Sequence, residues 1–392
     1  MTRPGGPLPW LGGLRIAIVN WRDPGHPEAG GAEVYAWEMA RGLLRRGATV
    51  TFVTARAEVQ PASERLDGVR VVRLGGRFTV YPRVLAWLLA RRRAFDAVID
   101  CENGIPFFTP WVLPRSVPVF CVVHHVHDAQ FGVHFPPVMA AFGRLLEGPV
   151  ARRTYRRRTT IAVSPSTAAA IASRLKWSGP VRIVPNGLHP AGPLPPGGPG
   201  VGGAGTVTWV GRIVAHKRAG LVLDVADRLR DTGVTIDVIG RGPGSAELAD
   251  GVSRRGLGGI VRLRGFLSEE AKRAAVGGSL LHLNTSLGEG WGLCVLEAAA
   301  LGVPTVGYDV DGLRDAVRPG ETGWLVRPGE RIEDVTERAL KELADPARRA
   351  GMAAACRSWA SQFDWDTSAA RLADLIAAAT GRPGAGVGNL PF

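Results

Sequence analysis

The chain has 392 residues, of which 45% are hydrophobic, and its formal net charge at pH 7 is +13. This length predicts two domains, each large enough for its own core, and the composition excludes a disordered protein. All but four of the 48 basic residues are arginine. The excess positive charge favours anionic partners such as nucleotides, phospholipid head groups or nucleic acid.

Cysteine usage and hydropathy bear on the compartment. The four cysteines show no CxxC spacing, which fits a reducing compartment and neither a disulfide framework nor a zinc site. No apolar run reaches the roughly 18 residues of a membrane span. Residues 1–13 lack the apolar core of a signal peptide. We therefore expect a cytoplasmic protein that can touch the inner face of the cell membrane.

Strand-like and helix-like segments alternate along the first half of the chain, which predicts a parallel α/β sheet. We expect one amphipathic helix at 33–46, which Gly47 ends. The expected strands are 14–20, 49–54, 69–74, 97–100, 117–123, 160–163 and 182–184.

A Pro/Gly-rich stretch at 189–205 cannot hold a helix or a central strand and predicts an interdomain linker. It separates an N-terminal domain at 14–188 from a second α/β domain at 206–360. A helix at 361–380 is expected to cross back to the first domain. The expected strands of the second domain are 206–210, 235–239, 261–264, 280–283 and 305–306, and its expected helices are 219–232, 269–275, 293–301 and 332–343.

The segment from Glu289 to Glu297 places two carboxylates eight residues apart. A short buried strand precedes it, and an alanine-rich helix is expected to begin near Gly292. A helix N-terminus offers unpaired N–H groups and partial positive charge, which favour a phosphate group. Two carboxylates on either side of such a site suit a sugar–diphosphate–ribose ligand. An exposed loop glutamate and a solvated helical glutamate are the bland alternative.

Two cations follow the first strand of the second domain. Arg212 and Lys217 lie at a predicted strand-to-helix turn, five residues apart. Arginine offers a planar fork of donors and lysine a compact charge, so the two together suit a diphosphate. In an arginine-rich protein they can equally be two surface cations.

Taken together, these motifs resemble the retaining glycosyltransferases of family four, which have the GT-B fold. Gly211-Arg212 with Lys217 is followed about seventy residues later by the Glu289-x7-Glu297 pattern. The resemblance covers residues 14–325. Further matching segments are Gly30-Gly-Ala-Glu33, Val163-Ser-Pro-Ser166, Val184-Pro-Asn-Gly187, Ile239-Gly-Arg-Gly-Pro-Gly244, Arg264-Gly-Phe-Leu267 and Gly320-Glu-Thr-Gly-Trp-Leu325.

The resemblance implies a role for each matched residue. Arg212 and Lys217 would hold the donor diphosphate together with the backbone N–H groups near Gly292 and Leu293. Glu297 would accept hydrogen bonds from the ribose, and Glu289 would contact the transferred sugar. The backbone of Phe266 and Leu267 would border the base. No cofactor and no metal ion are expected.

Three histidines, His124, His125 and His127, end a predicted N-domain strand and raise the question of a metal site. Strand alternation would put His125 and His127 on one face and His124 on the other. No cysteine cluster or HExxH pattern accompanies them, so we do not expect a zinc site. In the family that the chain resembles, one histidine here faces the transferred sugar. His124 matches that place best, and His127 remains an acceptor-side candidate.

Glycine patterns have two different interpretations. Gly30 and Gly31 precede a helix, and their bare backbone can approach a donor or an acceptor closely. An ordinary tight turn is the alternative. Gly240-x-Gly242-x-Gly244 has the wrong third spacing for a dinucleotide fingerprint, so we reject that function.

Two arginine clusters lie beside apolar residues, at 91–93 and at 152–158. The second ends a segment with Met139, Phe142, Leu145 and Leu146. Such segments can rest on anionic lipid, although a solvated helix face would look the same. The interleaved aromatic residues of a single-strand binder are not evident, so we expect no nucleic-acid partner.

The sequence favours a metal-independent, retaining hexosyltransferase on two Rossmann-like domains that face a central cleft. The donor would be a UDP- or GDP-linked sugar, and the acceptor a hydroxyl of a sugar, a lipid-linked molecule or a small molecule. Two alternatives remain open: a nucleotide-sugar epimerase or phosphorylase on the same fold, and a non-catalytic basic module that binds a membrane or nucleic acid.

Overall fold

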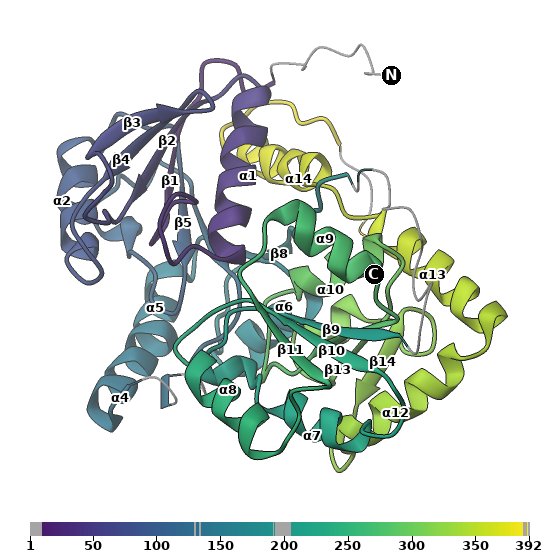
Figure 1. Cartoon of the computed structure of the whole chain (residues 1–392). Helices are drawn as coiled ribbons and strands as arrows, with labels where there is room; N and C mark the ends of the chain where they lie inside the picture. Colours follow the sequence, from purple (N-terminus) through teal and green to yellow (C-terminus); the bar gives the residue numbers. More distant parts are fainter. Residues whose placement is uncertain are drawn as a thin grey trace. The chain divides into compact units, whose positions relative to one another are not determined.

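The computed structural model describes residues 10–128, 131–132, 135–190, 192, 205–386 and 390. The chain divides into two units, which are described separately (Figure 1). Unit 1 comprises residues 1–187 and 364–392, and unit 2 comprises residues 188–363. Most of the predicted linker, residue 191 and residues 193–204, lies outside the described part of the chain.

Unit 1 is built on a sheet of eight strands in the order β3-β4-β2-β1-β5-β6-β7-β8. Within the described residues, its neighbouring strands are parallel except at the edge pair β3–β4. The strands are β1 (Arg15–Val19), β2 (Thr49–Thr54), β3 (Ser63–Leu66), β4 (Val69–Arg73), β5 (Ala97–Glu102), β6 (Val119–Val123), β7 (Thr159–Ala162) and β8 (Val181–Ile183). The helical elements are α1 (Gly31–Arg45), α2 (Val80–Ala90), η1 (Thr109–Trp111), α4 (Pro137–Leu145), the π-helical turn η2 (Leu146–Val150), α5 (Ala151–Tyr155), α6 (Pro165–Ser173) and α14 (Trp365–Ala379).

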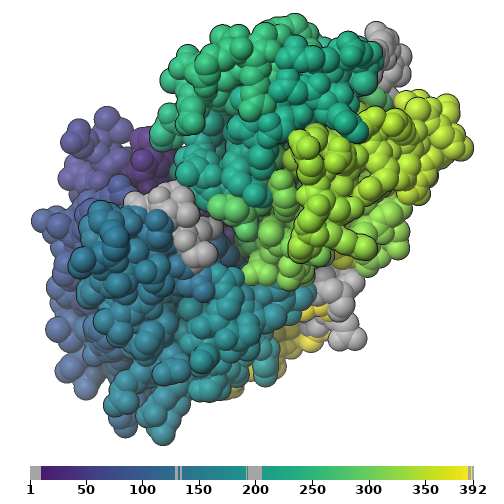
Figure 2. Space-filling model, turned by 90° about the horizontal axis from the view of Figure 1, so that it is seen from below, coloured from purple at the N-terminus to yellow at the C-terminus, as the bar shows by residue number. Residues whose placement is uncertain are grey.

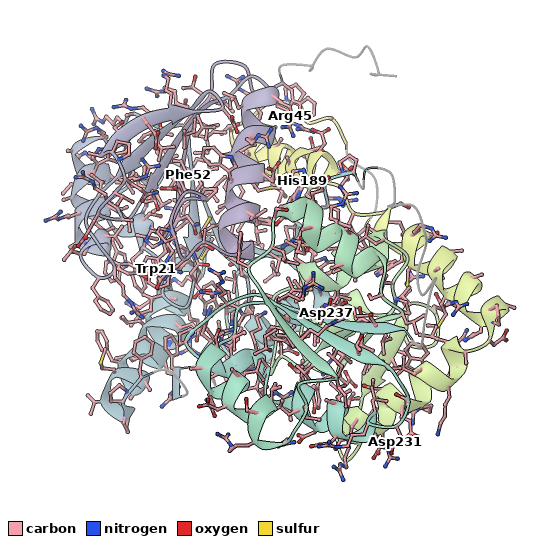
Figure 3. All side chains as sticks on the ribbon, viewed as in Figure 1. Trp21, Arg45, Phe52, His189, Asp231 and Asp237 are labelled. Atoms are coloured by element: carbon pink, nitrogen blue, oxygen red, sulfur yellow. The ribbon has the colours of Figure 1, made fainter. Side chains whose placement is uncertain are left out.

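The C-terminal helix α14 belongs to unit 1, where it lies beside α1 (Figure 1). Arg45, labelled in Figure 3, and Arg46 both pair with Asp366 at the start of α14, at 3.3 and 3.1 Å. A Cβ on Gly42 would lie 2.1 Å from the Cβ of Ala369, so only glycine allows the two helices to approach this closely. In Figure 2, yellow atoms of the C-terminal segment adjoin the teal atoms of unit 1.

Unit 2 is built on a parallel sheet of six strands in the order β11-β10-β9-β12-β13-β14. Its buried Asp237 on β10, labelled in Figure 3, pairs with Arg262 and Arg264 of β11. The strands are β9 (Thr206–Val210), β10 (Thr235–Ile239), β11 (Val261–Gly265), β12 (Leu281–Asn284), β13 (Thr305–Tyr308) and β14 (Gly323–Val326). The helical elements are η3 (Ala215–Lys217), α7 (Leu221–Arg228), α8 (Ser245–Arg254), α9 (Glu269–Gly277), α10 (Leu293–Ala300), α11 (Leu313–Ala316), α12 (Ile332–Leu343) and α13 (Pro346–Ala360).

The strand order of unit 2 has the Rossmann pattern. The first strand, β9, lies in the middle of the sheet; the next two strands are added on one side of it, and β12 begins a second series on the other side, so the strand order reverses between β9 and β12. Six strands of unit 1 repeat the pattern, with the reversal between β1 and β5. In such sheets, ligands bind beyond the carboxyl ends of the strands at this reversal. The predicted fold class, two Rossmann-like α/β domains, is confirmed.

The helix and strand bounds differ from the prediction at a few places. The predicted helix 219–232 is shorter as α7, because the Leu229 N–H already bonds back to Ala226 and the Thr232 hydroxyl binds the Leu229 carbonyl. Strands β3 and β14 were not predicted, since β3 is a polar edge strand without an apolar run. Within the described residues, no helix combines the length and the hydropathy that a membrane span needs.

Candidate functional site

The strand reversal of unit 2 gathers most of the predicted donor-site residues. Lys217 ends η3, which follows β9, and Glu289 lies in the loop that follows β12. These two strands are neighbours in the sheet. Their carboxyl ends therefore bring the two loops together, although 72 residues separate Lys217 from Glu289.

The backbone of Lys217 is tied to β12 by a buried hydrogen-bond chain. Trp209 Nε1 donates to the Thr285 hydroxyl at 2.9 Å, and that hydroxyl donates to the Lys217 carbonyl at 2.5 Å. Trp209 is only 2% exposed, and the packing around its side chain fixes the position of these hydrogen bonds. The backbone of Lys217 is therefore fixed, and the position of its ammonium group depends on the groups that it binds.

The ammonium of Lys217 forms an ion pair with Oε1 of Glu289. The same oxygen accepts a hydrogen bond of 2.7 Å from the Ser286 hydroxyl. The Glu289 N–H donates to the carbonyl of Asp311 at 3.0 Å. Sequence reasoning assigned Lys217 to the diphosphate and Glu289 to the sugar, but it did not foresee that the two side chains bind each other.

Arg212 lies in the loop after β9 and is exposed. Among the described residues, no acidic side chain pairs with its guanidinium. The loop is held by the glycines of the rejected fingerprint: a Cβ on Gly240 would lie 1.9 Å from the Gly211 carbonyl oxygen, and one on Gly242 would lie 2.2 Å from that of Ile213. Close packing of two loops, and not nucleotide binding, accounts for these glycines.

Helix α10 begins where the sequence predicted. Its N-cap Gly292 adopts a left-handed conformation with φ of 79°, and Leu293 is its first residue. No side chain caps the first turn, so backbone N–H groups there remain available to an anion. Burial raises the pKa of Cys294 to about 12, so this thiol is neutral and does not oppose an anion.

Glu297 lies in the second turn of α10, where its carboxylate binds Lys272 of α9 at 3.2 Å. Loss of hydration raises the pKa of Glu297, and Lys272 opposes this rise. The side chain is still 37% exposed, so water screens its interaction with Lys272. Lys272 also pairs with Glu269 at 2.8 Å. Sequence reasoning missed Lys272, although the scarcity of lysine was a signal.

The loop after β11 carries the residues predicted to border a base. Phe266 is 73% exposed, an unusual position for an aromatic side chain. Leu267 packs against a small core cluster that includes Ala298, the residue after Glu297. This packing links the Phe266–Leu267 loop to the helix that carries the predicted ribose ligand.

In unit 1, His124 follows β6 directly and is 7% exposed. Its ring makes an edge contact with Tyr35 at 5.2 Å, and its Nε2 atom has no hydrogen-bond partner. Burial, followed by the charges of His125 and His127, lowers the pKa of His124 to about 3. A neutral imidazole has one donor nitrogen and one acceptor nitrogen, so it can form a hydrogen bond with a hydroxyl group.

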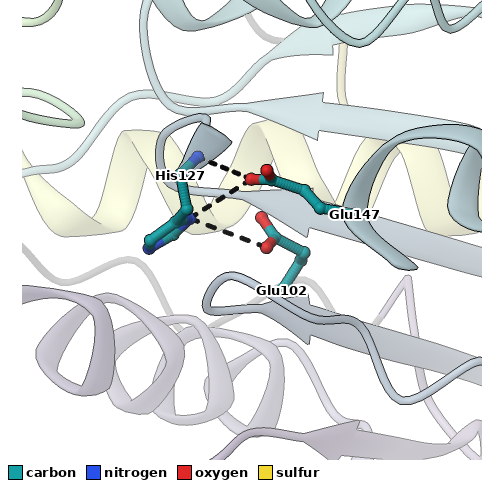
Figure 4. A group of neighbouring side chains, drawn as sticks. All are labelled: Glu102, His127 and Glu147. Atoms are coloured by element: carbon teal, nitrogen blue, oxygen red, sulfur yellow. Dashed lines mark hydrogen bonds and ion pairs between the residues drawn. The ribbon is translucent and has the colours of Figure 1, made fainter. Parts of the chain in front are cut away.

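His127 points to a different environment from His124. Its ring lies 3.8 Å from that of His125, tilted by 34°. Strand β6 ends at Val123, so the predicted alternation along a strand does not apply to these two histidines. The Nδ1 atom of His127 lies 3.4 Å from Glu147 and 3.8 Å from Glu102, two buried carboxylates (Figure 4). Burial raises the pKa of both glutamates, and the charge of Glu147 raises that of Glu102 further. The sequence concealed this cluster because its members are distant along the chain.

Gly30 is the N-cap residue of α1. Its N–H donates a hydrogen bond to the Glu33 carboxylate at 2.7 Å. A Cβ on Gly31 would meet no atom within 4 Å. Packing within the described residues therefore does not require glycine at position 31, and close approach of a ligand stays a prediction.

A pocket of about 470 Å³ opens at the carboxyl ends of β2 and β4 in unit 1. Arg56, Arg73 and Arg83 line it, together with Gly75 and Gly76. Arg73 is neutralised by Asp23 at 2.6 Å and by Glu64. Glu58 also lines the pocket, so Asp23, Glu58 and Glu64 offset the charge of its three arginines, and charge alone assigns it no ligand.

Two family models match the chain. Glycosyl transferases group 1 matches residues 201–359, and Glycosyltransferase Family 4 matches residues 29–191. The chain belongs to these glycosyltransferase families. Both predicted motif sets, those of the first domain and those of the second, fall within the matched ranges.

The chain is similar to a D-inositol 3-phosphate glycosyltransferase from Streptomyces scabiei, with 34% identity over 173 residues. That match covers 42% of this chain and 38% of the relative, so it spans well under half of the relative's length.

Two solved structures show the same GT-B fold. Sucrose-phosphate synthase from Thermosynechococcus elongatus has a TM-score of 0.76 at 21% identity, covering 94% of this chain and 99% of that one. HepE from Anabaena, solved with UDP and glucose, has a TM-score of 0.68 at 18% identity, covering 93% of this chain and 100% of that one.

Proposed function

We propose that the protein is a retaining glycosyltransferase that moves a hexose from a UDP- or GDP-linked sugar to an acceptor hydroxyl. The observation that carries this proposal is the Lys217–Glu289 ion pair beside the N-terminus of α10, at the strand reversal of unit 2. Family membership and the complex of the similar HepE with UDP and glucose support the choice of donor.

Binding of the donor would break contacts within the protein and form new contacts between the protein and the donor. Its diphosphate would bind Arg212, Lys217 and the free N–H groups of Gly292 and Leu293, which supply the positive charge that a metal ion would otherwise provide. We therefore propose that the transfer needs no metal on the diphosphate. Glu289 would accept hydrogen bonds from the sugar, and Glu297 from the ribose.

In the proposed front-face reaction, the bond between the anomeric carbon and the diphosphate oxygen breaks while the acceptor oxygen bonds to the same face. The acceptor proton passes to the leaving phosphate oxygen, so the reaction yields a nucleoside diphosphate and a glycoside of unchanged anomeric configuration. Arg212 and Lys217 would stabilise the charge that grows on the leaving group.

A panel of nucleotide sugars and free nucleoside diphosphates, screened by thermal unfolding, tests the donor assignment. A ligand that binds only the folded protein raises the free energy of unfolding, by roughly 2.7 kcal/mol at a concentration one hundred times Kd, and so raises the melting temperature. We expect UDP- or GDP-sugars to raise the melting temperature. No response to any member of the panel would overturn the proposed donor class.

His124→Ala is expected to lower kcat about tenfold and to leave donor Kd nearly unchanged, since one hydrogen bond to the reacting sugar contributes roughly 0.5–1.5 kcal/mol. Because the pKa of His124 is about 3, the imidazole stays neutral between pH 5 and 8. The pH profiles of wild type and variant should therefore have the same shape in that range, as steady-state kinetics can establish. A profile limb that disappears in the variant would contradict this role.

The α4 face supports the predicted contact with an anionic membrane surface. Four of its apolar side chains are exposed: Val138, Met139, Phe142 and Leu145. Leu146, the fourth apolar residue of the predicted segment, instead packs against the core. Arg152, Arg153, Arg156 and Arg157 are exposed shortly after this face. We propose that the face rests on anionic lipid.

Phe142→Ser is expected to weaken binding to phosphatidylserine vesicles about tenfold, because a buried phenylalanine contributes roughly 1.5–3 kcal/mol. Phe78→Ser is the matched control: Phe78 is 62% exposed and Phe142 is 58% exposed, but only Phe142 lies on α4. Vesicle sedimentation at low and high salt measures both effects. Equal binding of wild type and Phe142→Ser would contradict the assignment of this face.

A further inference from the structure

Two carboxylates of unit 1, those of Glu102 and Glu147, are buried close to each other. The side chains of Glu102 and Glu147 are 1% and 0% exposed. Among the described residues, no lysine or arginine forms an ion pair with either. Both oxygens of Glu102 and Oε2 of Glu147 make no hydrogen bond of standard geometry, although the nearby Gly104 N–H lowers the pKa of Glu102 and so opposes the effect of burial. Burial of unpaired carboxylates is costly, so some group must compensate them.

His127 completes a set of three potential metal ligands. Its Nδ1 atom lies 3.8 Å from Glu102 Oε1 and 3.4 Å from Glu147 Oε1, and the three ligand atoms all lie within 4.8 Å of one another. Zinc bonds of about 2.0–2.2 Å in a tetrahedral site hold ligand atoms roughly 3.4 Å apart. Both histidine distances match this spacing within a few tenths of an ångström.

Different elements hold these side chains in place before any ligand arrives. Glu102 ends strand β5, and Glu147 lies in the π-helical turn η2, a distortion that often marks functional sites. The His127 N–H donates to Glu147 Oε1 at 2.6 Å, which fixes the loop after β6 against η2. His127 remains 17% exposed and offers a path to solvent. Figure 4 shows the three side chains converging from a strand, a helical turn and a loop.

We propose that Glu102, His127 and Glu147 bind a divalent transition-metal ion, with zinc or manganese as the matching class. Two carboxylates and one neutral imidazole balance a charge of +2. The nitrogen ligand favours these ions over magnesium and calcium, which prefer oxygen ligands. Three protein ligands leave a position for water. The site lies within unit 1 and ties His127 to strand β5 and to η2, so it is independent of the proposed donor chemistry.

Metal analysis of the full-length protein, purified without a histidine tag, tests the proposal. After removal of metal with a chelator and dialysis against zinc or manganese, we expect about one ion per chain by mass spectrometry. The melting temperature should rise by about 5 °C or more at saturating metal, since only the folded protein holds the site.

Glu102→Gln and Glu147→Gln keep the side-chain volume and remove one charge. In metal-free protein they should not lower the melting temperature, because they relieve a buried like-charge pair; with metal, they should lose the rise that wild type shows. Asp100→Asn is the matched control on β5: Asp100 is fully buried but accepts hydrogen bonds from Phe107, Thr109 and Tyr155. It should lower stability and keep the response to metal.

Two outcomes would overturn the proposal. One is wild-type protein that binds well under one ion per chain and does not respond to either metal, which would assign the cluster to two glutamates that share a proton. The other is an equal response to metal in wild type and both glutamine variants, which would place the ion elsewhere.

Discussion

Lys217→Ala should weaken nucleoside diphosphate binding by about 10- to 150-fold, because a charged hydrogen bond contributes roughly 1.5–3 kcal/mol. The substitution removes the ammonium without disturbing the backbone, which Thr285 and Trp209 hold in place. It also removes the ammonium that pairs with Glu289, whose carboxylate is only 14% exposed and would then repel the expected diphosphate. Isothermal titration with UDP and GDP measures the loss.

Two further variants separate the causes of that loss. Lys217→Ala combined with Glu289→Gln should recover part of the affinity, because it neutralises the remaining carboxylate. Lys341→Ala is the matched control, since Lys341 also pairs with a glutamate but is 75% exposed on α12. It should bind the nucleotide as wild type does. Equal affinity of wild type and Lys217→Ala would sink the diphosphate assignment.

Gly312→Ala should destabilise unit 2 by about 3 kcal/mol and reduce transfer activity. Gly312 has φ of +77°, and a Cβ there would lie 2.3 Å from the carbonyl oxygen of Glu289. A positive φ costs a non-glycine residue roughly 1–2 kcal/mol, and the forced backbone shift adds roughly 1–3 kcal/mol. Because the Glu289 N–H bonds to Asp311, that shift must displace Glu289.

Gly320→Ala isolates the effect of the steric clash. Gly320 has nearly the same φ, +79°, but a Cβ there would meet no atom within 4 Å. This variant should lose only the roughly 1–2 kcal/mol of backbone strain and keep its activity. Chemical unfolding together with a transfer assay compares the two. If both glycine variants lost the same stability and activity, the contact between Gly312 and Glu289 would have no special role.

The fold was predictable because its signals are local. The apolar periodicity of α12 predicted both of its ends, Ile332 and Leu343. The glycine before Leu293 predicted the start of α10. Strand β3 has no such signal, since Ser63–Leu66 is a polar edge strand that pairs antiparallel to β4. Its pairing depends on a neighbour and not on its own pattern.

The candidate site was predictable only in part, since contacts between distant residues leave no local pattern. Lys217 and Glu289 were both identified from motifs, yet their ion pair follows from the adjacency of β9 and β12. Lys272 escaped notice because only the packing of α9 beside α10 brings it to Glu297. Sequence analysis did not single out Glu147, because the π-helical turn that buries it cannot be predicted from a local pattern.

Acceptor-dependent release of nucleoside diphosphate, followed by NMR of the product, tests the proposed activity most directly. Free sugars are the first acceptors in the assay. A broader set of hydroxyl acceptors follows. We predict that the diphosphate is released only with an acceptor and that the glycoside keeps the anomeric configuration of the donor. An inverted product, a donor sugar that isomerises without acceptor, or a sugar phosphate formed from inorganic phosphate would contradict a retaining transferase.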